Sequence, residues 1–181
     1  MIYPIVAYGS PLLRKPTEEI AADYPDLQKL IADMYETMDT ALGVGLAAPQ
    51  IGLNIRLFTI GAEAMAEEYP ECAGMRFVMI NPKIMERTGE DCTLEEGCLS
   101  IPGVNEKVTR KSRIRVSYFD ENFQAQDKVF EGYIARAIQH EYDHIEGILF
   151  TDRISPIRKQ LIKGKLSDIQ KRKISCRYRI K

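Results

Sequence analysis

The sequence contains few of the residues that disulfide-rich or membrane-spanning proteins require. Its 181 residues include only four cysteines and only two histidines. No run approaches the roughly 18 apolar residues that a bilayer span needs, so we expect no membrane insertion. The first residues lack the basic stretch, apolar core and small-residue cleavage site of a secretory signal, which favours a cytoplasmic protein. In that compartment, cysteines are expected as free thiols or metal ligands rather than as a disulfide framework.

Composition and length favour one globular domain over residues 1–181. Hydrophobic residues make up 45% and charged residues 28%, as in ordinary globular proteins, and this length favours a single core. The net charge of −1 conceals an asymmetry, because residues 155–181 contain ten Lys or Arg and a single acid, Asp168. A basic C-terminal helix and tail on an acidic body indicates a polyanionic partner, and the alternative is a solvated helix face.

The spacing of apolar residues predicts an α+β fold, with mostly antiparallel strands packed around a central helix. Gly43 and Gly147 are placed to end the first two helices in the left-handed conformation, and Ser155 with Pro156 is placed to begin the third. Residues 62–74 are expected as an irregular surface excursion. The expected helices cover 26–42, 133–146 and 155–171, and the expected strands cover 55–60, 76–80, 108–119, 124–132 and, loosely, 174–180.

The most informative local pattern is an H-E-x-x-H motif in the central predicted helix, His140-Glu141-Tyr142-Asp143-His144. Histidines four residues apart project from one helix face, about 5–6 Å apart at Cβ, which suits two ligands of one metal ion. Glu141 lies between them, where its carboxylate can act as general base on a water held by the ion. The motif also occurs by chance on ordinary helices, as two histidines without a role. Here both histidines of the chain fall in it, and burying them without a partner would be unfavourable.

A catalytic metal site needs a third protein ligand and an open position. The chain has no further histidine, so the candidates are acids and cysteines. Cys98 stands out because of its neighbours. Gly97 precedes it and lets a backbone segment or a substrate come close, and a short apolar run follows it. A lone cysteine is otherwise a small buried hydrophobic residue, which is how we interpret Cys72, Cys92 and Cys176 unless they are simply exposed.

A stretch of glycines and small residues follows the first predicted helix, Gly43-Val-Gly-Leu-Ala-Ala-Pro-Gln50-Ile-Gly52. Such a segment lets the backbone come close to a ligand, and Gln50 can donate an amide N–H into a cleft. Taken alone it is only a glycine-rich turn. It lacks the G-K-[ST] ending of a phosphate-binding loop, which argues against nucleotide binding.

Taken together and in this order, three stretches resemble the peptide deformylase family. Its motifs G-x-G-L-A-A-x-Q, E-G-C-L-S and Q-H-E-x-D-H stand here as residues 43–50, 96–100 and 139–144. The resemblance implies a hydrolase that removes the N-formyl group from N-formylmethionyl peptides. It also implies an α+β fold with the H-E-x-x-H helix at its centre.

The resemblance also assigns roles to individual residues. Cys98, His140 and His144 are implied as the metal ligands, and Glu141 as the catalytic acid and base. Gln50 and the backbone N–H of Leu99 are implied as oxyanion donors. Substrate contacts are expected at Gly45 and at its neighbour Val44, at Gly97, and at Ala137, which shares a helix stripe with Tyr133, Arg136 and His140.

The metal and the partners follow partly from ligand type and partly from the family. Two imidazoles and a thiolate would by themselves suggest zinc. The family typically works with Fe(II), so we expect one iron ion per chain, with zinc or nickel as substitutes. In some relatives a basic C-terminal helix docks on the ribosome, which residues 155–181 would fit. Residues 62–74 and the tail after Lys171 depart from the shortest members, and a monomer is expected.

Two other classes of protein fit parts of the sequence. A zinc endopeptidase also uses H-E-x-x-H, but it needs a downstream ligand, and Glu146 would point off the ligand face. A structural metal module, with RNA bound by the basic tail, would need a closed four-ligand site and gives Glu141 and Gln50 no role.

Overall fold

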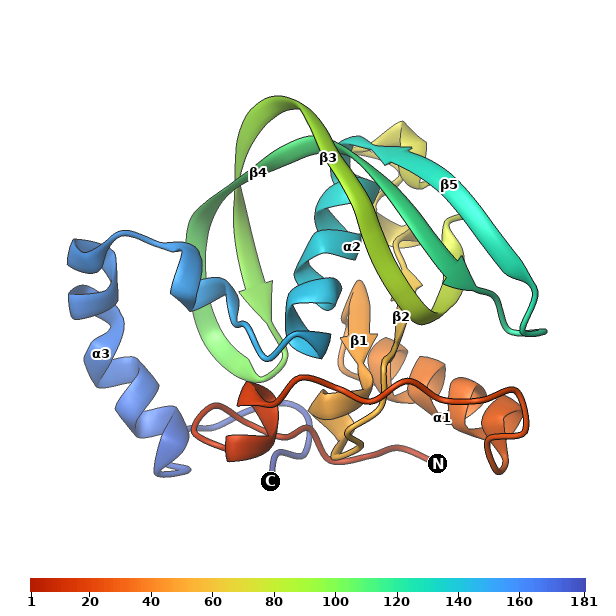
Figure 1. The fold of residues 1–181 in the computed structure, drawn as a ribbon. Coiled ribbons are helices and arrows are strands. Elements are labelled where there is room, and N and C mark those ends of the chain that lie inside the picture. The colour runs from red at the N-terminus through yellow and green to blue at the C-terminus, as the bar shows by residue number, and fades with distance from the viewer.

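The computed structural model describes all 181 residues and is built around one five-stranded antiparallel sheet (Figure 1). Each strand pairs with the next one along the chain, so the sheet order is the sequence order. The two longest strands curve strongly over the molecule (Figure 1). The strands are β1 (Gly45–Ala47), β2 (Leu57–Gly61), β3 (Arg76–Cys98), β4 (Ile101–Phe119) and β5 (Ala125–Glu131).

Three helices complete the fold, namely α1 (Leu27–Thr40), α2 (Gly132–Ile145) and α3 (Pro156–Gln170). Figure 1 shows α2 beneath the curved strands, with α1 below the sheet and α3 standing to one side. One face of α2 packs its apolar side chains against β2, β3 and β4, as Ile134 and Ile138 share a buried cluster with Phe58, Met79 and Val116. The predicted α+β class with a central helix is confirmed.

Local sequence signals set several helix boundaries as expected. Ser155 precedes α3, and its hydroxyl accepts the backbone N–H of Arg158 at 3.3 Å. Pro156 then occupies the first helical position, where its missing N–H costs nothing. Gly147 follows α2 with φ +73°, a conformation that glycine adopts without strain.

The end of α1 differs from the prediction. The left-handed residue after the helix is Leu42, with φ +57°, and not Gly43. Gly43 is needed for a different reason, because a Cβ there would lie 2.9 Å from the side chain of Leu99. The glycine therefore provides space beside the predicted active-site segment.

The strand predicted over 76–80 is wrong in its length, because β3 continues to Cys98. Asn81 adopts φ +49°, and the register with β4 shifts between Ile80 and Lys83. A bulge of this kind accommodates a proline without ending the strand, so Asn81-Pro82 bends β3 instead of closing it. The hairpin predicted over 108–132 is confirmed by the pairing of β4 with β5.

The strand predicted over 174–180 is also wrong. This segment is irregular and forms only a single parallel bridge between Ile180 and Ile5 near the N-terminus. Side chains in this segment do alternate in exposure, as the sequence suggested. Ile174, Cys176 and Tyr178 are half-buried, and the residues between them are exposed. The excursion over 62–74 is irregular, with short 3-10 turns, although its Cys72 side chain is fully buried.

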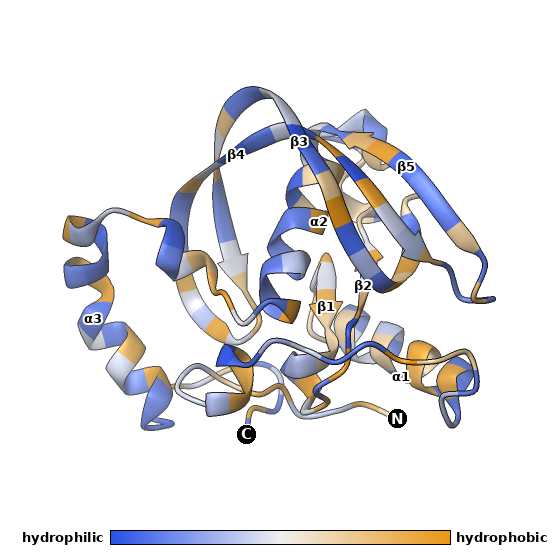
Figure 2. Cartoon of the chain, in the orientation of Figure 1, coloured by the Kyte–Doolittle hydropathy of each residue, from blue (hydrophilic) through white to orange (hydrophobic).

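Most residues of α3 are hydrophilic (Figure 2). Only Ile162 and Ile169 of this helix are buried, whereas Ile157 and Leu161 are exposed. None of the helices combines the length and the hydropathy required for a membrane crossing.

Candidate active site

Three predicted metal ligands meet where β3 ends beside α2. Cys98 is the last residue of β3, and His140 and His144 lie one turn apart on α2. Their candidate ligand atoms all lie within 4.8 Å of one another. The Nε2 atom of His144 is 3.2 Å from Cys98 Sγ. The structure therefore brings together the group that the sequence predicted, and a Cys/His/His set with one open position fits a catalytic metal ion.

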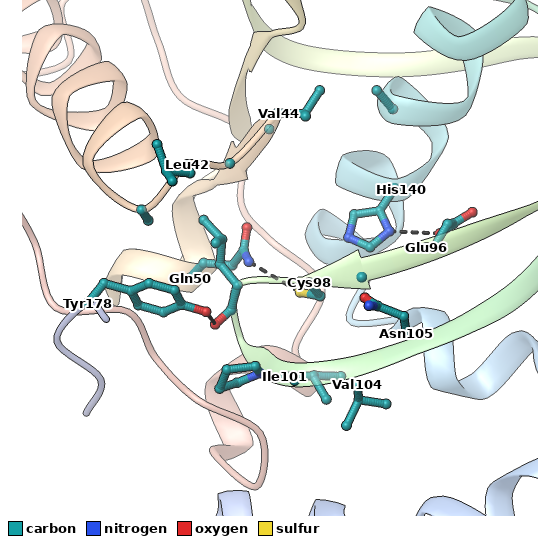
Figure 3. Close-up of a pocket in the computed structure, with 18 of the residues that line it drawn as sticks. Leu42, Val44, Gln50, Glu96, Cys98, Ile101, Val104, Asn105, His140 and Tyr178 are labelled. Carbon is teal, nitrogen blue, oxygen red and sulfur yellow. Dashed lines mark hydrogen bonds and ion pairs between the residues drawn. The ribbon is translucent and has the colours of Figure 1, made fainter. Parts of the chain in front are cut away.

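Glu96 fixes the orientation of His140. Its Oε1 lies 2.8 Å from His140 Nδ1 (Figure 3). The guanidinium of Arg110 donates to both oxygens of Glu96, at 2.6 and 2.9 Å. Burial alone would raise the pKa of Glu96, but the hydrogen bonds from Arg110 and His140 hold it well below its usual range. An ionised Glu96 requires a proton on Nδ1, which leaves the Nε2 lone pair of His140 free as a ligand.

The two histidines have pKa values that are shifted in opposite directions. Burial lowers the pKa of His144, so this imidazole stays neutral. Burial also disfavours charge on His140, but hydrogen bonds to Cys98 and Glu96 reverse the effect and raise its pKa. Positive charge is therefore favoured on His140 and disfavoured on His144.

A buried ionic network extends from Glu96 away from the cleft. Besides holding Glu96, Arg110 donates to Asp143 at 2.8 Å. Arg153 donates to both oxygens of Asp143 at 2.6 Å. Arg136 donates to Glu96 and to the carbonyl oxygen of Val108. Because each buried charge has an opposite partner, the network can hold Glu96 and His140 rigidly in place.

Glu141 faces the cleft in a buried position. Burial raises the pKa of Glu141 to about 7, which is a favourable range for proton transfer near neutral pH. Its Oε2 atom is buried and has no hydrogen-bond partner within the protein. A carboxylate oxygen in this position is costly unless a group in the cleft binds it. Gly45 makes room for the carboxylate, since a Cβ at that position would overlap it.

Gln50 has its amide orientation set by the backbone. Its Oε1 accepts the N–H of Ala47 at 2.9 Å, so the amide nitrogen must point the other way. That nitrogen lies 3.5 Å from Cys98 Sγ (Figure 3). It also lies 3.2 Å from Ser100 Oγ. The backbone N–H of Leu99 donates to no acceptor within the protein. Both predicted oxyanion donors therefore lie beside the predicted ligand Cys98.

A cleft of about 490 Å³ opens onto this group. The predicted substrate contacts Val44, Gly45, Gly97 and Ala137 all line it, as do Gln50, Cys98, Leu99, His140 and Glu141. Tyr133 and Arg136 also reach it, but the Arg136 guanidinium is bound to Glu96 and Val108. His144 lies behind the wall of the cleft and is almost fully buried.

Two features of the site were not predicted from the sequence. Glu96 belongs to the motif around Cys98, yet no role was assigned to it, although an acid next to a ligand segment is a typical partner for a ligating histidine. The tail residues 175–178 also line the cleft. No local pattern indicated this, because the tail is placed by contacts with the N-terminal segment.

Comparisons with known proteins agree with this geometry. A family model described as polypeptide deformylase matches residues 2–160. A peptide deformylase of Christiangramia forsetii is 50% identical over an alignment that covers 100% of this chain and 96% of that protein. One of Cytophaga hutchinsonii is 49% identical, with 100% and 97% covered. The crystal structure of peptide deformylase from Thermus thermophilus is 42% identical, covers 95% of this chain and 99% of its own, and superimposes with a TM-score of 0.84. The chain belongs to the peptide deformylase family.

Proposed function

We propose that this cleft carries out the family's reaction with Cys98, His140 and His144 as the metal ligands and Glu141 as the acid and base. The chain is a hydrolase that removes the N-formyl group from nascent polypeptides. The substrate we propose is the N-terminal formyl-methionine, with formate and a free amine as products. The observation that carries the proposal is the convergence of the three ligand atoms within 4.8 Å beside the buried Glu141.

The metal we propose is Fe(II), one ion per chain, with zinc or nickel able to substitute. The donor set supports a first-row divalent ion, since thiolate and imidazole both suit such metals. When bound, the ion would supply positive charge that polarises the formyl oxygen and lowers the pKa of a water ligand. The choice of iron rests on the family alone, because the same three ligands also suit zinc.

Glu141 is proposed to move the protons of the reaction. Its raised pKa, about 7, lets the carboxylate accept a proton from the attacking water and later release it near neutral pH. The proton then passes to the leaving amine as the carbon–nitrogen bond of the formamide breaks. The unpartnered Oε2 gives the carboxylate a free acceptor for the first transfer.

Gln50 and Leu99 are proposed to stabilise the negative charge that develops on the formyl oxygen. The Gln50 amide is already oriented by Ala47, so little reorganisation is needed in the transition state. The free N–H of Leu99 supplies a second donor. Val44, Gly45, Gly97 and Ala137 are proposed to contact the substrate, because all four line the cleft.

The two competing interpretations fit the structure less well. An endopeptidase would need a downstream ligand, but the Glu146 carboxylate forms an ion pair with Arg56. A structural metal module would need four protein ligands, and the metal-binding group here has three. A structural module would also give the buried carboxylate of Glu141 no chemical role.

The proposal is tested by formate release from a formyl-Met tripeptide under anaerobic conditions, with Fe(II) or Ni(II) supplied. Glu141→Ala should retain one metal ion per chain and lose turnover by at least about 100-fold. Glu67→Gln serves as the matched control, because Glu67 is exposed and forms no ion pair. Unchanged turnover in Glu141→Ala would contradict the role of this carboxylate, and absence of metal from the wild type would contradict the ligand set.

We further propose a monomer of one domain, residues 1–181, that acts in the cytoplasm and docks on the ribosome through residues 155–181. Lys163, Lys165 and Lys171 are exposed and pair with no acid, so their charge is available to phosphate groups. Changing all three to Glu should abolish co-sedimentation with ribosomes while leaving formate release intact. Docking that is as tight as in the wild type would refute this partner.

A further inference from the structure

The C-terminal tail forms part of the wall of the catalytic cleft. Residues 175–178 line the cleft, although they are far from the motifs in sequence. The end of the tail is held by backbone hydrogen bonds, from Lys181 N–H to Ile5 and from Ala7 N–H to Lys181, at 2.8 and 3.0 Å. Arg172 also donates to the carbonyl oxygen of Lys181 at 2.8 Å. The tail is therefore fixed against the body and does not hang free.

Tyr178 connects this tail to the segment that carries the ligand cysteine. Its hydroxyl donates to the carbonyl oxygen of Leu99 at 2.8 Å, across 79 positions of sequence (Figure 3). The ring packs against the apolar cluster around α1, as does the side chain of Leu99. Burial raises the pKa of Tyr178, so the hydroxyl keeps its proton and remains a donor.

The carbonyl that Tyr178 binds belongs to the peptide group between Leu99 and Ser100. At the other end of this group, the N–H of Ser100 donates to Cys98 Sγ at 3.4 Å. A peptide group is planar, so holding its oxygen also holds the direction of its N–H. Ser100 is further fixed because its carbonyl oxygen accepts the N–H of Tyr8 at 2.8 Å.

The N–H that points at Cys98 matters for the chemistry of the sulfur. A hydrogen bond to a thiolate withdraws electron density and tunes the metal that the sulfur binds. It also restrains the sulfur in the position that faces His144, whose Nε2 lies 3.2 Å away. Whatever orients the peptide group after Leu99 therefore influences the metal centre.

We propose that Tyr178 is a positioning residue for the metal centre, acting through the Leu99–Ser100 peptide group on Cys98. The inference rests on the proposed ligand set of Cys98, His140 and His144. The competing explanation is that Tyr178 only anchors the tail. The two explanations differ in whether removal of the hydroxyl changes the environment of the Cys98 sulfur.

The test uses the full chain loaded with Co(II), whose thiolate charge-transfer absorption reports on the sulfur ligand. Tyr178→Phe keeps the ring and removes only the hydroxyl. The matched control is Tyr24→Phe, since Tyr24 packs against the same apolar cluster and its hydroxyl makes no hydrogen bond. Three quantities are measured for each protein: the position of the charge-transfer band, the rate of Co(II) transfer to a chelator, and hydrogen exchange of the Ser100 amide in the Zn(II) form.

For Tyr178→Phe we expect a shifted band, faster exchange at Ser100, and release of Co(II) that is about two- to tenfold faster, the range for one neutral hydrogen bond. Tyr24→Phe should match the wild type in all three. Replacement of Tyr178 by 3-fluorotyrosine keeps the fold and makes the hydroxyl a stronger donor, so the band should move in the opposite direction.

A wild-type band and release rate in Tyr178→Phe, even with a lower melting temperature, would show that the residue only anchors the tail. If Tyr178→Phe does not fold, an unshifted band in the 3-fluorotyrosine protein overturns the proposal instead. A wild-type chain that does not bind Co(II) through Cys98 would overturn the metal centre itself, and this inference with it.

Discussion

The carboxylate of Glu96 lies 2.8 Å from Nδ1 of His140. This contact decides which nitrogen of the ring is available as a ligand, because an ionised carboxylate accepts hydrogen bonds and cannot donate one. The ionised state is maintained by Arg110, which binds both oxygens of Glu96. Glu96, which is outside the proposed ligand set, thus sets the protonation of a residue within that set.

Glu96→Gln should weaken metal binding and activity together. The amide has no negative charge, and it can present its nitrogen to His140 and disturb the ring. Outer partners of metal ligands typically contribute about 10- to 100-fold to affinity or activity, so we expect a loss in this range. Metal content after dialysis and kcat/KM for a formyl-Met peptide measure it. Glu90→Gln, at an exposed position of β3, is the control, and equal metal content in the two variants would contradict the prediction.

Gly45→Ala should reduce kcat while the metal stays bound. A methyl group at this position would overlap the Glu141 carboxylate, which must then move. Displacement of a general base by about 1 Å can cost about 100-fold in rate. Gly164→Ala is a suitable control, because a Cβ there would point into open space, and alanine should even stabilise helix α3. Normal kcat in Gly45→Ala would contradict the prediction, because it would mean that the carboxylate can move aside without loss of function.

Arg110→Met should strongly destabilise the fold. The Arg110 side chain is 4% exposed and joins Glu96 to Asp143, so its removal leaves two buried carboxylates without this partner. Breaking a buried pair of this kind costs about 3–5 kcal/mol. Arg115→Met removes a pair of similar geometry with Asp127, but at 45% exposure, where about 0–1 kcal/mol is expected. The free energy of unfolding of both variants is measured in urea. Equal losses of this free energy in the two variants would refute the role assigned to burial.

The group at the centre of the site was predicted from the spacing of the two histidines and, for Cys98, from the resemblance of its motif to the family. A spacing of four residues places His140 and His144 on one face of any helix, and the motif around Cys98 lies at the end of a strand. The supporting residues could not be predicted in this way. Glu96 meets Arg110 only because β3 pairs with β4 in a particular register, and no periodicity in either strand specifies that register.

The errors in the fold have a similar origin. Asn81-Pro82 usually ends a strand, but here a bulge lets β3 continue, and the bulge is stabilised by its neighbours. The Asn81 side chain, for example, accepts the N–H of Ile20 and donates to its carbonyl oxygen. The tail around Tyr178 was predicted as a strand from its alternation. Its actual path depends on contacts with the first residues of the chain, which lie outside any local window.

The ion pair between Arg14 and Asp152 should make stability depend on pH in the acid range. Burial would raise the pKa of Asp152, but the hydrogen bonds from Arg14 and from the backbone N–H of Leu149 lower it below the ordinary value of 3.8. A group with a depressed pKa in the folded state stabilises the fold above the unfolded value, and the contribution disappears as the pH falls through the folded pKa.

Asp152→Asn keeps an acceptor for Leu149 and removes the charge. The wild type should therefore unfold at a higher urea concentration than Asp152→Asn at pH 7, and the difference should diminish as the pH falls below 3.8. A difference that stays constant from pH 7 to pH 2 would show that the charge of Asp152 is not what stabilises this contact.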